Sequence, residues 1–361
     1  NSYLIQKADF IGCHNFSFLE YYNILGPLKK GGTFLLNSMH SCDDAWGHLP
    51  EHVQQQIIAT QARFYVIDAV SIAERLGLGS RINMVLQAAF FKISNIIPEE
   101  KAMAAIEKAI KKTYGKYGEK TVEMNINAMK EGFSEVALVK YPGFVETPDL
   151  STPAEDVPFI IKNYCTMAAE APEFVCNTIG TLIANEGDNT KVSQIPMDGT
   201  WPVGTTRYEK RNIAVNIPVW DPEICTQCGV CSFVCPHAAI RLKVYEEGDL
   251  KGAPSTFKST DAKGKEFAGM KATVQVAPED CTGCEACVNN CPVVNKQEPG
   301  KKAINMHLQE PLREQEAANF DFFLNIPELS VDKYSKTNMK NVQLAPHHFE
   351  FSGACAGCGE T

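Results

Sequence analysis

Two short cysteine runs with identical spacing constrain the fold of this chain more than any other feature of its sequence. The pattern Cys-x2-Cys-x2-Cys-x3-Cys-Pro occupies residues 225–236 and again residues 281–292, so eight of the 14 cysteines lie in these two runs. A chain of 361 residues can bury a core without disulfides, and clustered cysteines in such a chain indicate metal ligands in a reducing compartment. We therefore expect a metal-binding domain in this part of the chain.

The chemistry that fits these runs best is that of [4Fe–4S] clusters. The spacing is that of bacterial ferredoxins, in which the fourth cysteine of each run ligates the cluster of the other run. One cluster is thereby assigned to Cys225, Cys228, Cys231 and Cys291, and the other to Cys281, Cys284, Cys287 and Cys235. Small residues among the ligands (Gly229, Gly283, Ala286) leave backbone N–H groups free to approach the sulfur atoms. Zinc is the alternative, because Cys-x2-Cys pairs also build tetrahedral sites, but four-ligand zinc does not explain the third cysteine and the Cys-Pro step.

A further Cys-x2-Cys pair, Cys355 and Cys358, stands near the end of the printed sequence. By its spacing alone, this pair is compatible with a dithiol redox couple, with half of a zinc site or with two ligands of a third cluster. In the last case, the other two ligands are missing from this sequence.

The first 165 residues alternate between strand-like and helical patterns. We expect short strands at 8–12, 33–36 and 64–70, and helices at 18–28, 50–61, 69–76 and 99–114. The segment 84–97, which is apolar around most of its face, is either a buried helix or a packing seam. The first helix is expected to stop at Lys29-Lys30-Gly31-Gly32, because basic residues followed by glycine are typical of helix C-termini. Strands that alternate with helices favour a parallel sheet with helices on its faces. The predicted fold class is α/β plus α+β: a parallel-sheet α/β domain, a small irregular linker module and a bacterial-type 2[4Fe–4S] ferredoxin domain.

The rest of the chain has a different texture. Between residues 166 and 217, Pro, Gly, Asn and Asp recur without periodicity, which predicts a small irregular module. Residues 218–325 contain the cysteine runs, and the polar stretch at 246–270 between them is expected to be an exposed insertion. Another domain is expected to begin near residue 326. The sequence starts at Asn1 without a signal segment, so its N-terminus looks cut.

The charge and hydropathy of the chain exclude two classes of protein. With 34 Lys and Arg against 43 Asp and Glu, the formal net charge is −9. This balance provides no global basic field for nucleic acid, although it would suit a basic electron-transfer partner. No apolar run approaches the about 18 residues that a membrane span needs. We expect neither nucleic-acid binding nor membrane insertion.

Five local signatures occur in the order in which one enzyme family carries them. They are Ala8-Asp9-Phe10-Ile11 with the segment 27–36, the segment 79–84 with 87–91, Tyr208-Glu209-Lys210-Arg211, the double cysteine run, and the segment 351–361. On these motifs the chain resembles the pyruvate:ferredoxin (flavodoxin) oxidoreductases, which oxidise 2-oxoacids with thiamine diphosphate. The resemblance covers essentially all 361 residues, and the flanking motifs distinguish the chain from a generic ferredoxin.

This resemblance implies a domain organisation and further site residues. Residues 1–165 correspond to most of an α/β domain that binds coenzyme A, 166–217 to a linker module named after Glu-Lys-Arg, 218–325 to the ferredoxin-type domain, and 326–361 to the start of the domain that binds thiamine diphosphate. It makes Cys355 and Cys358 two ligands of a third cluster close to the thiamine. By the same analogy, Asn83 and Asn125 are candidates for contacts with coenzyme A. No catalytic residue is assigned within this sequence.

The function implied is oxidative decarboxylation of pyruvate with coenzyme A to acetyl-CoA and CO2, with electrons passing through the clusters to ferredoxin or flavodoxin. The cofactors of the complete enzyme are then thiamine diphosphate and Mg2+ besides the clusters, and the enzyme is expected to be a homodimer in the cytoplasm, or in a hydrogenosome if the source is an anaerobic protist. Because the pyruvate and thiamine residues are missing here, we expect a central fragment. The alternatives are the same chemistry on another 2-oxoacid, and a standalone polyferredoxin-like electron carrier.

Overall fold

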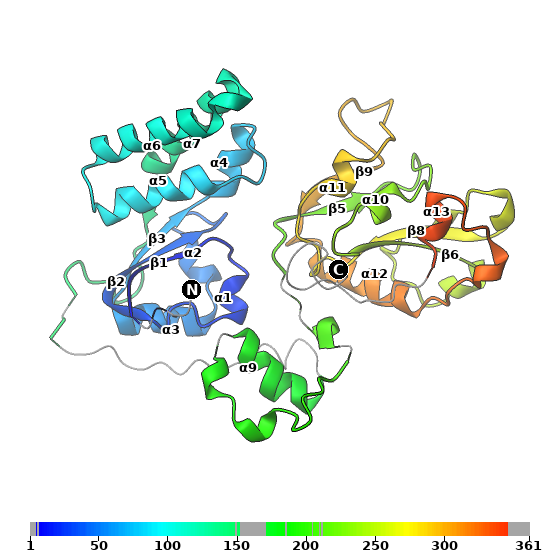
Figure 1. Cartoon of the computed structure of the whole chain (residues 1–361), viewed down its shortest axis with the longest axis horizontal. Coiled ribbons are helices and arrows are strands. Elements are labelled where there is room, and N and C mark those ends of the chain that lie inside the picture. Colours follow the sequence, from blue (N-terminus) through cyan, green and yellow to red (C-terminus); the bar gives the residue numbers. More distant parts are fainter. Residues whose placement is uncertain are drawn as a thin grey trace. The chain divides into compact units, whose positions relative to one another are not determined.

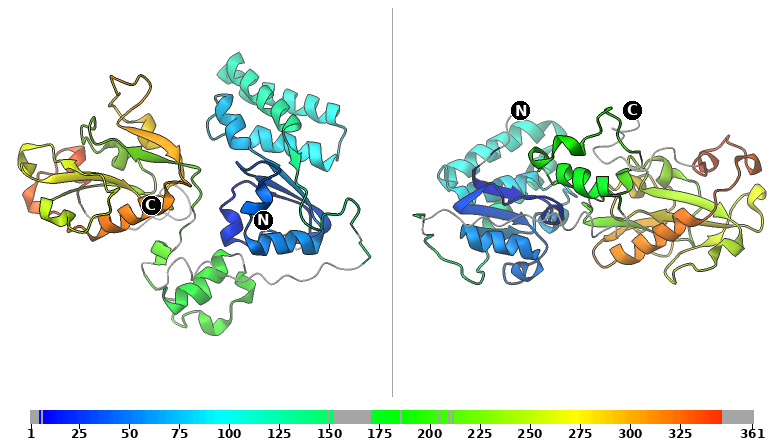
Figure 2. Two further views of the ribbon diagram at one scale, coloured as in Figure 1. Left: turned by 180° about the vertical axis from the view of Figure 1, so that it is seen from behind. Right: turned by 90° about the horizontal axis from the view of Figure 1, so that it is seen from below.

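The structure, a computed structural model, describes residues 5, 7–148, 150–151, 171–184, 186–203, 205–208, 210 and 212–345. The chain divides into two compact units, Asn1–Ile195 and Pro196–Thr361, which can be followed by colour in Figures 1 and 2. Among the described residues, no helix has the length and apolar character that a membrane crossing requires.

The first unit is built on a four-stranded sheet with the strand order β1-β2-β3-β4. The strands β1 (Ala8–Cys13), β2 (Leu28–Asn37) and β3 (Arg63–Ile67) run parallel to one another. The short β4 (Ala137–Leu138) pairs with β3 in the antiparallel direction and forms an edge. The expected parallel sheet is therefore confirmed.

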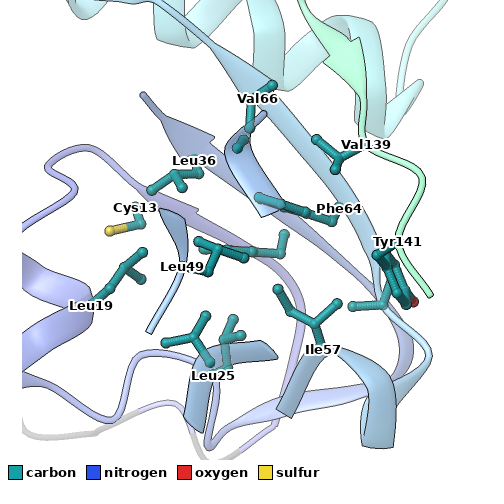
Figure 3. Packing of buried hydrophobic residues seen from close by; sticks show 14 of the residues in the cluster. Cys13, Leu19, Leu25, Leu36, Leu49, Ile57, Phe64, Val66, Val139 and Tyr141 are labelled. Carbon is teal, nitrogen blue, oxygen red and sulfur yellow. The ribbon is translucent and has the colours of Figure 1, made fainter. Parts of the chain in front are cut away.

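Helices cover both faces of this sheet (Figure 1). One face carries α1 (Phe18–Tyr21), α2 (Ala45–His48) and α3 (Glu51–Thr60), and the other carries α4 (Ala69–Arg75), α5 (Asn83–Ser94), α6 (Glu99–Tyr114) and α7 (Glu119–Ser134). The side chains of β2 alternate accordingly: Phe34 and Leu36 belong to the core under α1–α3 (Figure 3), whereas Leu35 belongs to the core under α4 and α5. A strand that is apolar on both faces is typical of a sheet covered on both sides.

The predicted helix at 18–28 is wrong beyond its first turn. The chain is helical only over Phe18–Tyr21, and Tyr22 is already extended. Proline lacks the N–H that a helix needs and disfavours helical geometry in the residue before it, so the Gly26-Pro27 step accounts for the end of the predicted span but not for the break at Tyr22. The run Lys29–Gly32, predicted as a helix stop, lies inside β2, where the register against β1 shifts and Gly31 has a positive φ of 71°.

A small module at 171–195 completes the first unit. It contains a wide helical turn at Val175–Ile179 followed by α9 (Gly180–Ile183), with irregular backbone after it. The amide of Asn23 accepts a hydrogen bond from Gln56 Nε2 (2.8 Å) and donates one to Glu186 Oε1 (3.0 Å). This polar link joins the module to the loop after α1.

The second unit contains two small antiparallel sheets. The strands β5 (Asn216–Trp220) and β9 (Ile304–Leu308) form one, and β6 (Ile240–Tyr245), β8 (Lys271–Val276) and β7 (Thr260–Asp261) form the other in the order β6-β8-β7. Its helices are α10 (Val230–Phe233), α11 (Ala286–Asn289), α12 (Arg313–Asn325) and α13 (Met339–Val342). Each cysteine run is flanked by one strand of each sheet, so the unit has an internal pseudo-symmetry.

The stretch between the two cysteine runs is more structured than its composition predicts. Within the expected exposed insertion, β7 pairs with β8, and Phe267 is only 1% exposed in the core of the unit. Tyr334 and Leu344, from the segment after α12, are buried in the same core. Turn-rich composition signals irregular backbone, but it does not show whether single large side chains reach a core.

We expect Gly132→Ala to destabilise the first unit by about 1–3 kcal/mol, because overpacking forces backbone shifts. A Cβ atom at residue 132 of α7 would lie 2.5 Å from the Val85 carbonyl oxygen and 2.9 Å from Ala88 Cβ on α5. The matched control is Gly115→Ala at the end of α6, where no atom lies within 4 Å and φ is −54°. Urea unfolding followed by circular dichroism measures both; equal midpoints would contradict the packing described.

Candidate metal centre

The two cysteine runs fold into the same backbone turn. Gln227 and Gly229 in the first run have φ values of 58° and 76°, and the equivalent Gly283 and Glu285 in the second run have φ values of 68° and 62°. In both runs a single helical turn, α10 or α11, follows directly. Positive φ is uncommon for residues other than glycine, so the same spacing imposes the same turn even where one run has a side chain and the other has none.

Each turn directs a backbone N–H group at its first cysteine. The N–H of Gln227 donates to Cys225 Sγ over 3.2 Å, and the N–H of Gly283 donates to Cys281 Sγ over 3.4 Å. Such N–H groups stabilise thiolate charge and help to set the potential of an iron–sulfur cluster. The donor expected at Gly283 is confirmed, whereas Gln227 was not singled out by the sequence because it is not a small residue.

The fourth cysteine of the first run lies with the second run. A cavity in the second unit is lined by the four side chains predicted to hold one cluster, Cys235, Cys281, Cys284 and Cys287. Burial raises the pKa of the Cys281 and Cys287 thiols to about 12, and their proximity to Cys235 acts in the same direction. The rest of the lining is mostly apolar (Pro218, Pro236, Ala239, Ile240, Val276, Ala286 and Met306) and includes three polar residues, His237, Thr282 and Glu285.

The three leading cysteines of the first run also lie close together. Burial raises the pKa of the Cys231 thiol to about 12, and nearby Cys225, Cys287 and Cys228 raise it further. Cys291 packs against an apolar cluster that cysteines of both runs contact, Cys225, Cys231, Cys235 and Cys281 among them. All eight cysteines are free of disulfide bonds, so they are available as ligands.

The donor set of the two runs fits iron–sulfur clusters. In the part of the chain that the structure describes, no three His, Cys, Asp or Glu side chains are gathered closely enough to hold one ion. In a cubane, each thiolate binds a different iron atom, so the four sulfur atoms surround a larger body than they do around zinc. The N–H groups aimed at sulfur and the apolar cavity fit such a group.

The other predicted site residues have different surroundings. Asn83, the first residue of α5, is exposed, whereas Asn125 on α7 is 4% exposed and donates from Nδ2 to the Thr121 carbonyl oxygen over 2.8 Å. The helices α5 and α7 pack together, but only Asn83 presents an accessible side chain. Cys355 and Cys358 lie outside the described residues.

An ion pair holds the second run to the segment before β5. Lys210 Nζ contacts Asp280 Oδ2, whose side chain is only 5% exposed and immediately precedes Cys281. Lys210 is the described lysine of the Tyr208–Arg211 motif. Lys210 therefore helps to hold a cysteine run in position. The sequence of the motif does not reveal this contact.

These features define a dicluster iron–sulfur unit that follows an α/β unit, and comparison with known proteins agrees. The model of the 4Fe-4S dicluster domain matches residues 217–307, the model of pyruvate ferredoxin/flavodoxin oxidoreductase matches residues 1–135, and a domain of unknown function matches residues 161–214. The resemblance to the pyruvate:ferredoxin (flavodoxin) oxidoreductase family is thereby confirmed.

Curated relatives extend this similarity to the whole chain. The pyruvate-flavodoxin oxidoreductase of Nostoc sp. is 47% identical over 100% of this chain and 30% of its own length. The pyruvate:ferredoxin oxidoreductase of Moorella thermoacetica is 44% identical over 100% of this chain and 29% of its own length. The pyruvate dehydrogenase (NADP+) of Cryptosporidium parvum is 37% identical over 100% of this chain and 19% of its own length. The chain thus spans less than a third of the length of these relatives.

We expect Asp280→Asn to destabilise the second unit by about 1–3 kcal/mol, because it removes the charge that compensates a partly buried ammonium group. The control is Glu298→Gln, which removes the partner of Lys301 from a pair whose side chains are 61% and 54% exposed; such a pair contributes less than about 1 kcal/mol. Urea unfolding followed by peptide-resolved hydrogen exchange compares the two. A larger effect of Glu298→Gln would contradict this assignment.

Proposed function

We propose that this chain is the electron-transfer and coenzyme A-binding part of an enzyme that oxidatively decarboxylates pyruvate to acetyl-CoA and CO2. The proposal is supported by similarity along the whole chain to proteins named for this reaction. When bound, the clusters supply one-electron redox chemistry. The residues of this chain hold them, direct N–H groups at the ligand sulfur atoms and surround them with apolar side chains.

The proposed ligand sets exchange the fourth cysteine between the runs. Cys225, Cys228, Cys231 and Cys291 hold the first-run cluster, and Cys281, Cys284, Cys287 and Cys235 hold the second-run cluster. The single observation that carries the proposal is the cavity that unites Cys235 with the three leading cysteines of the second run. Exchange of ligands between runs is the arrangement of two-cluster ferredoxins.

The finer domain organisation is part of the same proposal. Residues 1–165 would bind coenzyme A, and residues 166–217 would connect this domain to residues 218–325, which would carry the two clusters. Residues 326–361 would begin the thiamine diphosphate domain. Cys355 and Cys358 would be two ligands of a third cluster. Asn83 is the better placed of the two candidates for coenzyme A, because the amide of Asn125 is buried and donates within its own helix. Thiamine diphosphate, Mg2+ and a second copy of the chain would complete the enzyme.

The proposed electron acceptor is ferredoxin or flavodoxin. The similar protein of Nostoc sp. is named for flavodoxin, and that of Moorella thermoacetica is named for ferredoxin. The similar protein of Cryptosporidium parvum is named for NADP+. The aligned segment is therefore compatible with more than one final acceptor. A direct assay is reduction of flavodoxin by the dithionite-reduced, desalted chain, followed at the flavin absorbance.

Anaerobic reconstitution is expected to load the two cysteine runs of each chain with about eight iron and eight sulfide ions, four of each per cluster. Cys291→Ala removes one ligand from the first-run cluster, so we expect the iron content to fall to about four to seven with loss of part of the electron paramagnetic resonance signal. The matched control is Cys42→Ala, which removes a free, half-buried thiol outside both runs and should leave the iron content unchanged.

Three results would each contradict part of this proposal. Zinc in place of iron would remove the electron-transfer account. Full iron content in Cys291→Ala, together with an unchanged spectrum, would show that Cys291 is not a ligand. A chain that loads both clusters but reduces no flavodoxin or ferredoxin would leave the cluster assignment standing and overturn the proposed acceptors.

A further inference from the structure

The surroundings of the two turns differ although their backbones agree. Gln227 in the first run is 1% exposed, and both polar atoms of its side-chain amide have a partner: Nε2 donates to the Asp261 carbonyl oxygen over 2.8 Å, and Oε1 accepts the N–H of Lys263 over 2.8 Å. The equivalent residue of the second run is Gly283, which has no side chain. Only the first turn can therefore be held through a side chain at this position.

Two lysines converge on the same turn. Lys263 Nζ donates to the Cys225 carbonyl oxygen over 2.6 Å. Lys340 Nζ donates to Gln227 Oε1 over 3.2 Å and to the Lys263 carbonyl oxygen, and it lies 4.8 Å from the centroid of the Phe267 ring. Neutral oxygen atoms and a ring face are partners that an ammonium group takes as a cation.

The ammonium group of Lys340 lies within electrostatic reach of a proposed ligand. Burial lowers the pKa of Lys340, whereas Glu266 and Cys225 act in the opposite direction. Glu266 Oε1 also accepts a hydrogen bond from Asn341 Nδ2 over 3.2 Å. Partial burial means that the positive charge of Lys340 is less screened by solvent than that of a surface lysine.

The position of Lys340 is built into the fold. It lies on α13, and its Cα would be only 3.0 Å from a Cβ atom at residue 229, so glycine at this position of the first turn permits the approach. Ser232 Oγ on α10 donates to Gln343 Oε1 over 3.0 Å, which ties the two short helices together. The segment after α12 thus brings a cation to a turn more than one hundred residues earlier in the chain.

We propose that Lys340 is a positioning and electrostatic residue that raises the reduction potential of the first-run cluster relative to the second-run cluster. The inference rests on the proposed function, since it requires clusters at the two runs. One-electron reduction of a [4Fe–4S] centre adds one negative charge, and a nearby fixed cation stabilises the reduced form more than the oxidised form. A cluster held by the first run would then be easier to reduce with Lys340 present than without it.

The test is a redox titration of the reconstituted chain with dithionite as the electron donor, followed by electron paramagnetic resonance. The unsubstituted chain should show two midpoint potentials. In K340Q we expect one midpoint to move down, with a roughly fivefold lower ratio of reduced to oxidised cluster at a fixed solution potential, while the other midpoint stays in place. K340R retains the charge and should keep both midpoints at their unsubstituted values.

The control is K333Q in the same segment, where the side chain is 58% exposed and its ammonium lies 4.0 Å from Glu246; neither midpoint should move. If K340Q does not retain the cluster, K263Q is expected to lower the same midpoint. The inference is overturned if K340Q shifts both midpoints or neither, or if K340R shifts as far as K340Q. Iron and sulfide analysis of each sample separates the two proposals: an unsubstituted chain without iron refutes the function, whereas full loading with unshifted midpoints refutes this inference alone.

Discussion

The placement of Cys235 beside the second cysteine run is the constraint on which the second unit depends. Its thiol lines one cavity with Cys281, Cys284 and Cys287, although 44 residues of chain separate the two runs. Because the two turns must face each other for this to happen, the strands that precede and follow each run must also pair across the unit. The pairings β5–β9 and β6–β8 meet that requirement.

We expect loading of the clusters and folding of the second unit to be coupled. Cys287 is 8% exposed, and burial raises the pKa values of the Cys231, Cys281 and Cys287 thiols. Cysteine binds metal as a thiolate, so binding of the clusters has to release these protons. The first unit does not share this dependence, because its parallel sheet buries an apolar core on each face.

Local sequence patterns predicted the parts that depend on local chemistry. The amphipathic helix at 99–114 was predicted with the bounds that α6 has, and the alternation of strands and helices correctly indicated a parallel sheet. The helix expected at 18–28 failed already at Tyr22, where the backbone is extended, and the Gly26-Pro27 step opposes a helix only at the end of that span. The cysteine spacing indicated the clusters, and the family model for residues 217–307 bears this out.

Long-range contacts could not be predicted from one sequence. Neither Gln227 nor Lys340 carries a motif, and their importance follows from a meeting of distant segments around Cys225. The burial of Phe267 within a polar stretch is hidden for the same reason. One sequence difference between the two runs could have pointed to this site. The first run has a glutamine where the second run has a glycine, which indicates that the two turns have different surroundings.

The central claim is that the two runs exchange their fourth cysteine around two iron–sulfur clusters. Diffraction at the iron absorption edge, from crystals of the reconstituted chain grown without oxygen, tests it most directly. The account predicts two iron centres, one bonded to Cys225, Cys228, Cys231 and Cys291 and the other to Cys281, Cys284, Cys287 and Cys235. A centre bonded to all four cysteines of a single run, or tetrahedral zinc at either run, would contradict it.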